Sequence, residues 1–575
     1  MVSRLRKSAS NCNIQSLEVD GIQSGPSVCR LTFSSNNCPR TNIGFLQLRL
    51  CITHLFSVKR VSSQLWIFKH DSPGLYEVSV LKRLHQFYTG SKMLDNKSND
   101  NNTTPFFQDA TPGQLLFYLA VPTLLLSVII SGLGFISNSP IFFISGSALL
   151  IIWFIMIFAA VLPQTNRTLS KQIDQIKKVT GIIVVSLIVL GLLDAAVITL
   201  LIPNLIQNHN ISNDFRPLLT EVENGYRYND ASALSQQAIE NLLHGQNPYA
   251  HANIIQALLE YNGNYSRITP LRLGVFSDVF PAPQDSQLKQ VWDKAIQNPT
   301  QVPSELESRV CYPAGSFLLP APFIYLGISD IRIVYAIFFL AGLVYAIWVI
   351  PKKKRLIFVG VVLISLELWN SLGDGGELGN LCFPLLMVGW LALNRNLWLS
   401  TICMGLAVAT KQITWFFVPF YLILLFKTQG LKKLLAGTAV IGGIFIIINL
   451  PFIIADPRLW FNSVTSPMTD PMFPLGNGLI TIVSSGLLNI QSSLPFTILE
   501  GIVFIACILW YLRYCRRYPQ TGMILAIIPL FFAWRSMFSY FFYVDIILLA
   551  YILVNDTNRQ TIPLDTNPSY NEQIF

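Results

Sequence analysis

Long apolar runs separated by short polar turns fill the chain between residues 113 and 554. A helix needs about 20 apolar residues to cross the core of a bilayer. The pattern predicts an all-α, polytopic integral membrane protein with about twelve transmembrane helices, some of them short. The predicted spans are 113–133, 140–162, 180–203, 331–350, 355–371, 380–394, 398–411, 413–427, 433–454, 496–513, 520–534 and 538–554.

Two further apolar stretches, 314–328 and 476–491, are interpreted as re-entrant or interfacial segments. With this choice, all four basic clusters of the short loops fall on one face of the membrane. These clusters lie within 167–178, 352–355, 427–433 and 513–517. Cytoplasmic loops are enriched in Lys and Arg, so this face is expected to be cytoplasmic. The long loop 204–313 is then outside the cytoplasm, and the expected location is the plasma (cell inner) membrane.

Composition agrees with the membrane class, because 52% of the residues are hydrophobic and only 12% are charged. Soluble domains carry about 25% charged residues. The net charge is +9, and residues 1–92 alone hold 12 Lys and Arg against 4 Asp and Glu. This excess is confined to one stretch without a repeated basic and aromatic pattern, so nucleic acid is not an expected partner.

Three regions follow from these patterns: a basic and polar N-terminal region 1–112, predicted to be disordered, the membrane domain 113–554, and a polar tail 555–575. The abrupt change of composition raises the hypothesis that the natural chain begins at Met93. None of the nine cysteines forms a Cys-x-x-Cys pair. The sequence therefore predicts no disulfide framework and no zinc site.

The outer loop predicts a helix from Ala231 to His244, ended by Gly245, with one apolar face. A second short amphipathic stretch surrounds residues 254–259. Short helices of this kind suit the membrane surface. Asp230 precedes the first helix, where it would serve as an N-cap. The same carboxylate is a candidate general base that removes a proton from an acceptor hydroxyl, and the two interpretations are compatible.

Polar side chains interrupt the apolar sequence at three other places. A glycine-rich segment holds Asp374, Glu377 and Asn380, and is either a solvated loop or the lining of a ligand cavity. Lys411 stands within an apolar stretch, and Arg535 ends a span beside aromatic residues. Both cations are either snorkelling side chains or functional groups, for which phosphate is a suitable partner.

Several of these motifs resemble the C-type glycosyltransferase superfamily, and in particular the bacterial polyprenyl-phosphate-mannose-dependent α-1,2-mannosyltransferase-like family. Asp230, its helix and the segment Gly245-Gln246-Asn247-Pro248-Tyr249 are similar to the first outer loop of that superfamily. Tyr312-Pro313 with Pro320 resembles its Tyr-Pro-Pro segment. Glu377 to Asn380 resembles its Gly-Gln-x-Asn element, and Gly405 to Lys411 its Gly-Leu-Ala-x-x-x-Lys element. The resemblance covers about residues 180–430.

The chain also departs from the family pattern. Tyr-Pro-Pro is replaced by Tyr312-Pro313-Ala314, and Gly-Gln-x-Asn by Glu377-Leu378-Gly379-Asn380. Many members have paired acidic residues in the first loop, where this chain has Asn229-Asp230. These departures leave the identity of the donor and the use of a metal open.

The resemblance implies an enzyme that moves a sugar, with a mannose-like hexose favoured, from a polyprenyl-phosphate donor to a lipid-linked, glycan or protein acceptor. Asp230 would be the general base, and Lys411 and Arg535 would hold the donor phosphate. Eight further residues are expected to bind substrate: Asn229, Asn247, Tyr249, Tyr312, Asp374, Glu377, Asn380 and Gln412. No cofactor is required by this scheme, and a divalent cation held by Asp374 and Glu377 stays open.

Two other classes of protein fit parts of the pattern. Charges within the membrane and broken helices are also typical of transporters and lipid flippases, although no inverted repeat relates the two halves. A membrane scaffold without catalytic activity is the other alternative. The Asp230 carboxylate distinguishes them, because an enzyme is expected to lose turnover in an Asp230→Asn variant and a scaffold is not.

Overall fold

The computed structural model describes residues 110–137, 139–196, 227–263, 265–365, 368, 371–372 and 376–559, together with four short strands nearer the N-terminus. The chain divides into two compact units, Met1–Asn101 and Asn102–Phe575. The first unit contains two antiparallel pairs, formed by β1 (Ile14–Val19) with β2 (Cys29–Phe33) and by β3 (Leu65–Ile67) with β4 (Tyr76–Val78).

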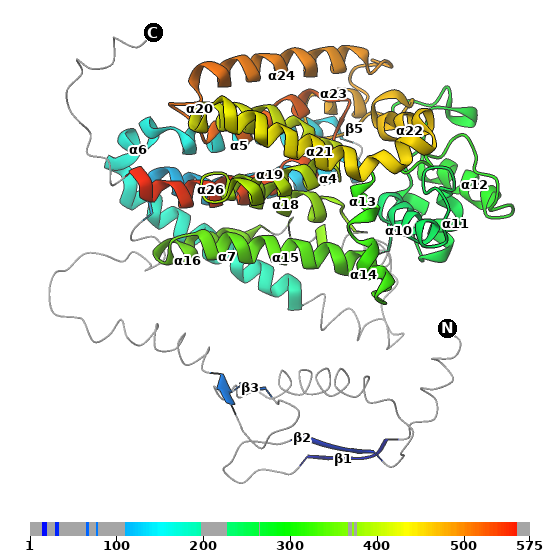
Figure 1. Ribbon diagram of the computed structural model, residues 1–575, viewed down its shortest axis with the longest axis horizontal. Helices are drawn as coiled ribbons and strands as arrows, with labels where there is room; N and C mark the ends of the chain where they lie inside the picture. The colour runs from blue at the N-terminus through cyan, green and yellow to red at the C-terminus, as the bar shows by residue number, and fades with distance from the viewer. Residues whose placement is uncertain are drawn as a thin grey trace. The chain divides into compact units, whose positions relative to one another are not determined.

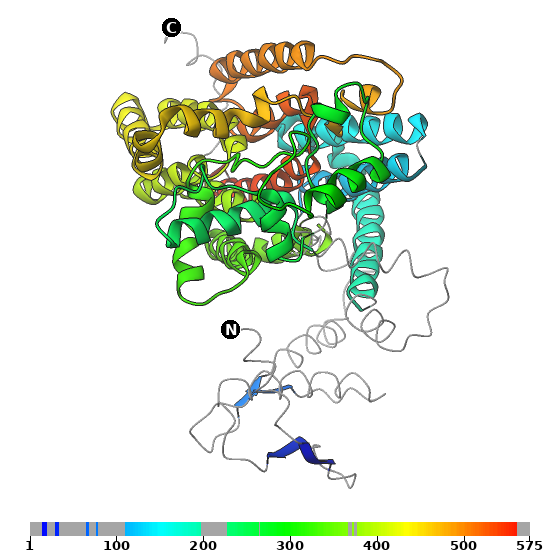
Figure 2. The same ribbon diagram turned by 90° about the vertical axis from the view of Figure 1, so that its right-hand side faces the viewer.

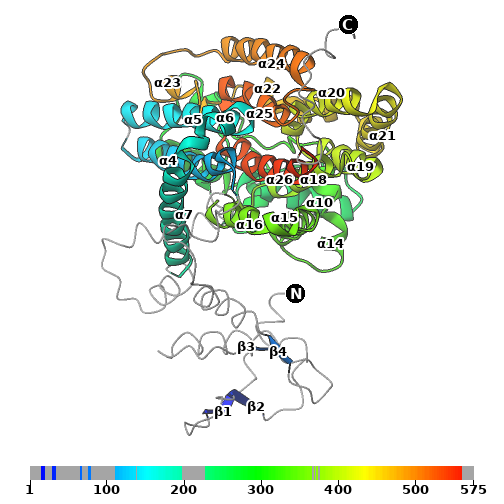
Figure 3. The same ribbon diagram turned by 90° about the vertical axis from the view of Figure 1, so that its left-hand side faces the viewer.

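The second unit is mostly helical. Its apolar helices are α4 (Pro112–Ser137), α5 (Pro140–Val161), α7 (Ile173–Ala196), α15 (Ile331–Val349), α16 (Arg355–Ile364), α18 (Gly379–Ala392), α19 (Leu397–Val408), α20 (Val418–Gln429), α21 (Leu431–Ala455), α24 (Leu494–Tyr514), α25 (Thr521–Ile527) and α26 (Phe542–Arg559). The short α6 (Pro163–Leu169) follows α5. Most of these helices run along the bundle, whereas α7 crosses their direction at its edge (Figure 3).

Among the described residues, six helices are long and apolar enough to cross a membrane: α4, α5, α15, α21, α24 and the segment Phe538–Asn555, which holds most of α26. The twelve predicted spans are thus not confirmed, although each contains helix in its described part. The shorter helices end at identifiable residues. The helix α25 ends at Ile527, before Pro529 begins a separate 3-10 turn, because proline has no backbone N–H to continue the helix. The helix α19 ends three residues before Lys411.

The polar loops gather at one end of the second unit (Figures 1 and 2). They contain α10 (Asp230–Leu243), α11 (Ile254–Glu260), α12 (Asp285–Ala295), α13 (Gly315–Leu318), α14 (Ala321–Tyr325) and α22 (Pro457–Thr469). The helix α10 lies within one residue of its predicted bounds and ends before Gly245, whose φ is +74°. Its apolar residues, among them Leu234 and Ile239, are buried with Ile254 and Phe317. Protein therefore covers the face that was expected to lie on the membrane surface.

The two stretches interpreted as non-spanning contain no helix of spanning length. Residues 314–328 form α13 and α14, which are interrupted at Pro320. Residues 476–491 begin at the second residue of β5 (Leu475–Gly476) and contain the four-residue α23 (Thr481–Ser484). The strand β5 pairs in parallel with β6 (Arg535–Ser536). This pairing fixes a loop after α22 against the segment that leads into α26.

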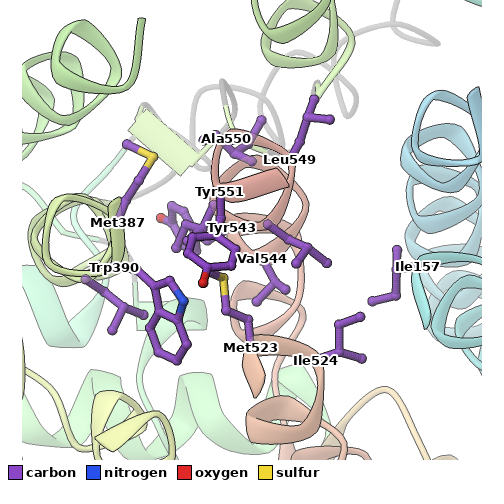
Figure 4. Packing of buried hydrophobic residues seen from close by; sticks show 14 of the residues in the cluster. Ile157, Met387, Trp390, Met523, Ile524, Tyr543, Val544, Leu549, Ala550 and Tyr551 are labelled. Atoms are coloured by element: carbon purple, nitrogen blue, oxygen red, sulfur yellow. The ribbon is translucent and has the colours of Figure 1, made fainter. Parts of the chain in front are cut away.

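The core of the bundle lies around α26 (Figure 4). Trp390 of α18, Tyr543 and Tyr551 of α26 and Ile524 of α25 are all buried there. Large aromatic side chains each bury about 150–250 Å² and dominate such a core. One carboxylate lies in it: Asp545 of α26 is 1% exposed and accepts hydrogen bonds from Trp153 Nε1 at 3.1 and 3.3 Å.

Contacts between residues in or beside the four basic clusters place these clusters at one end of the bundle. Arg395 donates to the carbonyl of Val349 beside the 352–355 cluster, and Gln429 donates to the carbonyl of Leu393. Gln164 donates to the hydroxyl of Tyr518, which joins the ends of α5 and α24. Lys427, in the 427–433 cluster, lies close enough to Cys515, in the 513–517 cluster, for its charge to interact with the thiol. The four clusters that were expected to share one face of the membrane therefore lie at the same end of the bundle.

Candidate functional site

Asp230 is the first residue of α10, and its neighbour Asn229 is the N-cap. The Asn229 side chain accepts hydrogen bonds from Ser232 N at 2.8 Å and Ser232 Oγ at 2.9 Å. The expectation that Asp230 serves as the N-cap was wrong. Asn is as good a cap as Asp, and with Asn229 in this position the Asp230 carboxylate is released for other contacts.

The Asp230 carboxylate is half-buried and faces Thr269. Its Oδ2 accepts hydrogen bonds from Thr269 N at 2.8 Å and Thr269 Oγ1 at 2.6 Å, and its Oδ1 accepts one from Ala231 N at 2.7 Å. An ionised carboxylate has about four acceptor positions, so these contacts leave about one for a substrate. The arrangement holds the carboxylate in place and leaves one of its lone-pair positions free.

Lys411 forms an ion pair with Glu377, and their Nζ and Oε1 atoms lie 2.7 Å apart. The Lys411 side chain is 9% exposed and that of Glu377 25%. The ammonium group also lies 5.9 Å from the ring centroid of Tyr312. The cation was expected to be available to a donor phosphate, but it already has a carboxylate partner. Asp374, also predicted at this site, lies outside the described residues.

Gln412 and Tyr249 form hydrogen bonds with the backbone of the segment that carries Tyr312. The Gln412 side-chain amide donates hydrogen bonds to the carbonyls of Cys311, at 2.5 Å, and Val464, at 2.7 Å. The Tyr249 hydroxyl donates to the Tyr312 carbonyl at 2.8 Å, and its ring packs edge-on against Phe317. Both residues were predicted to bind substrate, and the structure places their donors on backbone carbonyls.

Asn247 and Asn380 also have protein partners. Asn247 Oδ1 accepts from Tyr249 N at 3.1 Å, which stabilises the turn after α10. Asn380 is 1% exposed. Its Nδ2 donates to the Ser371 carbonyl at 2.9 Å, and its Oδ1 accepts from the Tyr543 hydroxyl at 3.0 Å. The Asn380 side chain therefore joins the start of α18 to α26.

The thiol of Cys311 shows which charges share its surroundings. Burial, together with the carboxylates of Glu307 and Asp230, raises the pKa of Cys311 to about 12, and the charge of Lys411 acts in the opposite direction. Burial raises the pKa of the neighbouring Tyr312 hydroxyl, and the negative charges of Asp230 and Glu377 also raise it. The structure thus brings Asp230, Glu377 and Lys411, which come from separate parts of the sequence, into one polar centre around residues 311–312.

Glu307, which no sequence motif marked as a site residue, adds a carboxyl group to this centre. It is 4% exposed, and its Oε1 accepts a hydrogen bond from Arg309 N at 2.8 Å. Arg309 Nη1 in turn lies 2.8 Å from both oxygens of Asp470. Burial and the nearby Asp470 carboxylate raise the pKa of Glu307 to about 7. No motif near residue 307 pointed to such a group.

A second ion pair that the sequence analysis did not single out joins the outer loop to α15. Asp330 caps this helix, and Arg332 donates to its two oxygens at 3.0, 3.1 and 2.7 Å. The Tyr228 hydroxyl donates to Asp330 Oδ1 at 2.7 Å. Burial acts against ionisation of the carboxylate, but these hydrogen bonds outweigh it and lower the pKa of Asp330.

Arg535 differs from Lys411 in having no carboxylate partner. It is half-buried in β6, and its guanidinium makes no hydrogen bond or ion pair with any residue that the structure describes. Arg535 and Lys411 both lie close enough to Tyr540 for their charges to interact with its hydroxyl. The Tyr540 hydroxyl in turn interacts electrostatically with that of Tyr312. Arg535 therefore lies on the same side of the bundle as the polar centre around residues 311–312.

No group of three His, Cys, Asp or Glu side chains among the described residues is arranged to hold a metal ion. A cavity of about 280 Å³ lies elsewhere, at the opposite end of α18. It is lined by Trp390, Leu391, Asn394, Arg395, Tyr551, Val554 and Asn555. Asn380 and the polar centre lie at the beginning of α18, so this cavity does not belong to the candidate site.

The chain matches no protein-family model, no curated protein and no solved structure. The part of the chain that the structure describes is mostly helical, contains six helices long and apolar enough to cross a membrane, and has its polar loops gathered at one end.

Proposed function

We propose that this protein is a membrane glycosyltransferase that moves a sugar, with a mannose-like hexose favoured, from a polyprenyl-phosphate donor to a lipid-linked, glycan or protein acceptor. One observation carries the proposal. A fixed carboxylate with a free acceptor position, Asp230, lies on the same side of an apolar helical bundle as Arg535, a cation without an ion-pair partner among the described residues. The resemblance of the outer-loop motifs to the C-type superfamily supports the same function.

The reaction uses these two groups in one displacement. The acceptor hydroxyl gives its proton to Asp230, and its oxygen forms a bond to the anomeric carbon of the sugar. The bond between that carbon and the donor phosphate oxygen breaks, and the electron pair leaves with the polyprenyl phosphate. Arg535 stabilises the negative charge that grows on the phosphate. Attack from the face opposite to the leaving group inverts the configuration at the anomeric carbon.

We infer that the polar centre faces the outside of the plasma membrane. The four basic clusters lie at the other end of the bundle, and basic loops favour the cytoplasmic side. The shorter apolar helices α16, α18, α19, α20 and α25 would then cross together with the six long ones and α7, as in the twelve-span topology. A lipid-linked donor in the same bilayer would reach the centre from the side.

A transporter or lipid flippase is the second candidate, and Asp545 favours it. This carboxylate is buried within a span-length segment and has Trp153 as its only hydrogen-bond donor among the described residues. Ionisable groups in such positions often mark transport pathways.

Purified protein in vesicles containing a polyprenyl-phosphate sugar labelled in the sugar distinguishes the two functions. A transferase moves the label into a new glycosidic product when an acceptor lipid or glycan is added. A flippase changes the leaflet of the labelled donor and leaves it chemically intact. Label that stays on the donor and moves between leaflets would contradict the proposed transferase.

A further inference from the structure

The cavity of about 280 Å³ lies at the end of the bundle that holds the four basic clusters, away from the polar centre. Two elements line it. The end of α18 and the turn after it contribute Trp390, Leu391, Asn394 and Arg395, and α26 contributes Tyr551, Val554 and Asn555. The rings of Trp390 and Tyr551 pack edge-on there (Figure 4). Ligand sites have volumes of about 300–1,000 Å³, so this cavity suits a small polar group.

The cavity presents hydrogen-bond donors that the described part of the protein does not use. Trp390 is 1% exposed, and its Nε1, which can only donate, makes no hydrogen bond with any described residue. Arg395 donates from Nη2 to the Val349 carbonyl at 3.0 Å, which leaves about four of its five N–H groups. The exposed side-chain amide of Asn394 has no partner among the described residues. Because buried polar groups are nearly always hydrogen-bonded, the indole N–H indicates a missing acceptor.

The backbone acceptors beside the cavity are occupied. The Ala392 carbonyl accepts hydrogen bonds from Arg395 N at 2.9 Å and Asn396 N at 2.8 Å. The Leu393 carbonyl accepts one from Gln429 Nε2 at 2.8 Å. The lining side chains include one cation and no carboxylate. A ligand must therefore bring its own acceptors, and the positive charge selects an anion with several oxygens.

Two of the basic clusters flank the cavity. Arg395 and Arg355 both donate to carbonyls at the end of α15, which places the 352–355 cluster beside the cavity. Gln429, within the 427–433 cluster, donates to a carbonyl just after α18. Clustered charges of one sign attract ions of the opposite sign and raise their local concentration. The surroundings of the cavity thus favour the same kind of ligand as its lining.

We propose that this cavity binds the phosphate group of an anionic phospholipid head group. A guanidinium binds two phosphate oxygens with parallel hydrogen bonds, and the indole and amide N–H groups supply donors for further oxygens. Basic pockets between helices on the cytoplasmic side of a membrane are suited to such head groups. The choice of a phospholipid over a soluble phosphate rests on the membrane placement proposed above. The site does not depend on sugar transfer.

Binding of a radiolabelled short-chain phosphatidylglycerol to the full-length protein in detergent tests this site. Arg395→Gln is expected to weaken saturable binding by about 10-fold or more, because hydrogen bonds to charged groups are the strong ones. Arg516→Gln, at an exposed arginine of the same end but outside the cavity, makes the same change of charge and should bind like the wild type. Unchanged affinity in Arg395→Gln, or equal losses in the two variants, would overturn the proposal.

Two further variants keep the test decisive if Arg395→Gln does not fold. Trp390→Phe removes the unpaired N–H and keeps an aromatic ring against Tyr421 and Tyr551, so it should fold and bind the lipid several-fold more weakly. Asn394→Asp places a negative charge at an exposed position of the lining and should also weaken binding. If the cavity holds only buried water, both variants will bind the lipid like the wild type, which would overturn the proposal.

Competitors identify the source of the phosphate. Unlabelled phosphatidylglycerol is expected to displace the labelled lipid, and the zwitterionic phosphatidylcholine and sodium phosphate are expected to do so only weakly. Sodium phosphate that competes as well as the lipid would overturn the lipid assignment, and equally effective phosphatidylcholine would overturn the selection of an anion. Because the assay involves no sugar transfer, failure of the proposed transferase would leave these results unaffected.

Discussion

Lys411 Nζ lies 2.7 Å from Glu377 Oε1, although 34 positions separate the two residues in the sequence. The pair connects the loop before α18 to the end of α19. Because Lys411 is 7% exposed, its charge would be uncompensated without Glu377. The pair therefore holds the first turn of α18 in register with the segment that leads into α20, and it accounts for a cation that apolar sequence surrounds.

Removing either member of this pair is expected to destabilise the protein. Lys411→Met leaves Glu377 without its cation, and Glu377→Gln leaves a buried ammonium, so each should lower the free energy of unfolding by about 3 kcal/mol. The double variant should be more stable than either single variant, because no uncompensated charge remains. Thermal unfolding in detergent measures the three variants, with Lys294→Met at an exposed site as the control. Additive losses in the double variant would argue against the pair.

Glu307 is expected to make stability fall as the pH rises. Burial and Asp470 raise its pKa in the folded protein to about 7, whereas an unfolded Glu titrates near 4.3. The folded state therefore holds the proton more tightly. Its contribution is complete below about pH 4 and is lost as the pH rises to about 7. Glu307→Gln should remove this dependence and raise stability at pH 8 by on the order of 1–2 kcal/mol.

The control for this experiment is Glu260→Gln, at an exposed position at the end of α11. Thermal midpoints are compared at intervals between pH 4.5 and pH 8. Parallel pH profiles for Glu307→Gln and the wild type would show that the raised pKa does not contribute to stability.

Asp330 is expected to have the opposite dependence on pH. Hydrogen bonds from Arg332 and Tyr228 lower its pKa, so its stabilisation is present at neutral pH and is lost as the pH falls through the lowered value. Asp330→Asn should lower the free energy of unfolding at pH 7 by about 1–2 kcal/mol. Asp293→Asn, which breaks an exposed pair on α12, should change the thermal midpoint little. Equal effects of the two substitutions would contradict this role.

Local features of the fold could be predicted from the sequence, because their causes lie within a few residues. The spacing of apolar residues and the glycine at 245 placed α10 within one residue of its observed position. The apolar runs gave the long helices α4, α5, α15, α21 and α24. The stretch 476–491 was interpreted as non-spanning because this choice placed the four basic clusters on one face, and it contains no helix of spanning length. The helix predictions depend on periodicity, on turn residues or on length, and the interpretation of 476–491 depends on the placement of charge.

Long-range contacts could not be predicted in the same way. Whether Lys411 is free or paired depends on how α18 and α19 pack. No sequence feature near residue 411 identifies Glu377 as its partner. The buried carboxyl of Glu307 likewise depends on neighbours more than 50 residues away. For this reason the sequence identified Arg535 as a candidate cation but did not show that its strand, β6, pairs with β5.

We propose that Asp230 is the base of a sugar transfer, because Thr269 and Ala231 hold its carboxylate in place and leave about one acceptor position free. Asp230→Asn keeps one acceptor oxygen for Thr269 but loses the acceptor for Ala231 N, and it cannot take up a proton. It should therefore lower transfer by about 100-fold or more, while the lost hydrogen bond lowers the free energy of unfolding by only about 1 kcal/mol. Asp278→Asn, at an exposed outer-loop position, controls for the loss of a negative charge near the site.

The most direct measurement compares these variants with the wild type in membranes supplied with radiolabelled polyprenyl-phosphate mannose or glucose. The account predicts that label enters a lipid or glycan product with the wild type and with Asp278→Asn, and that Asp230→Asn, folded and present in equal amount, forms almost none. Equal product from Asp230→Asn and the wild type would contradict the assignment of Asp230 as the base.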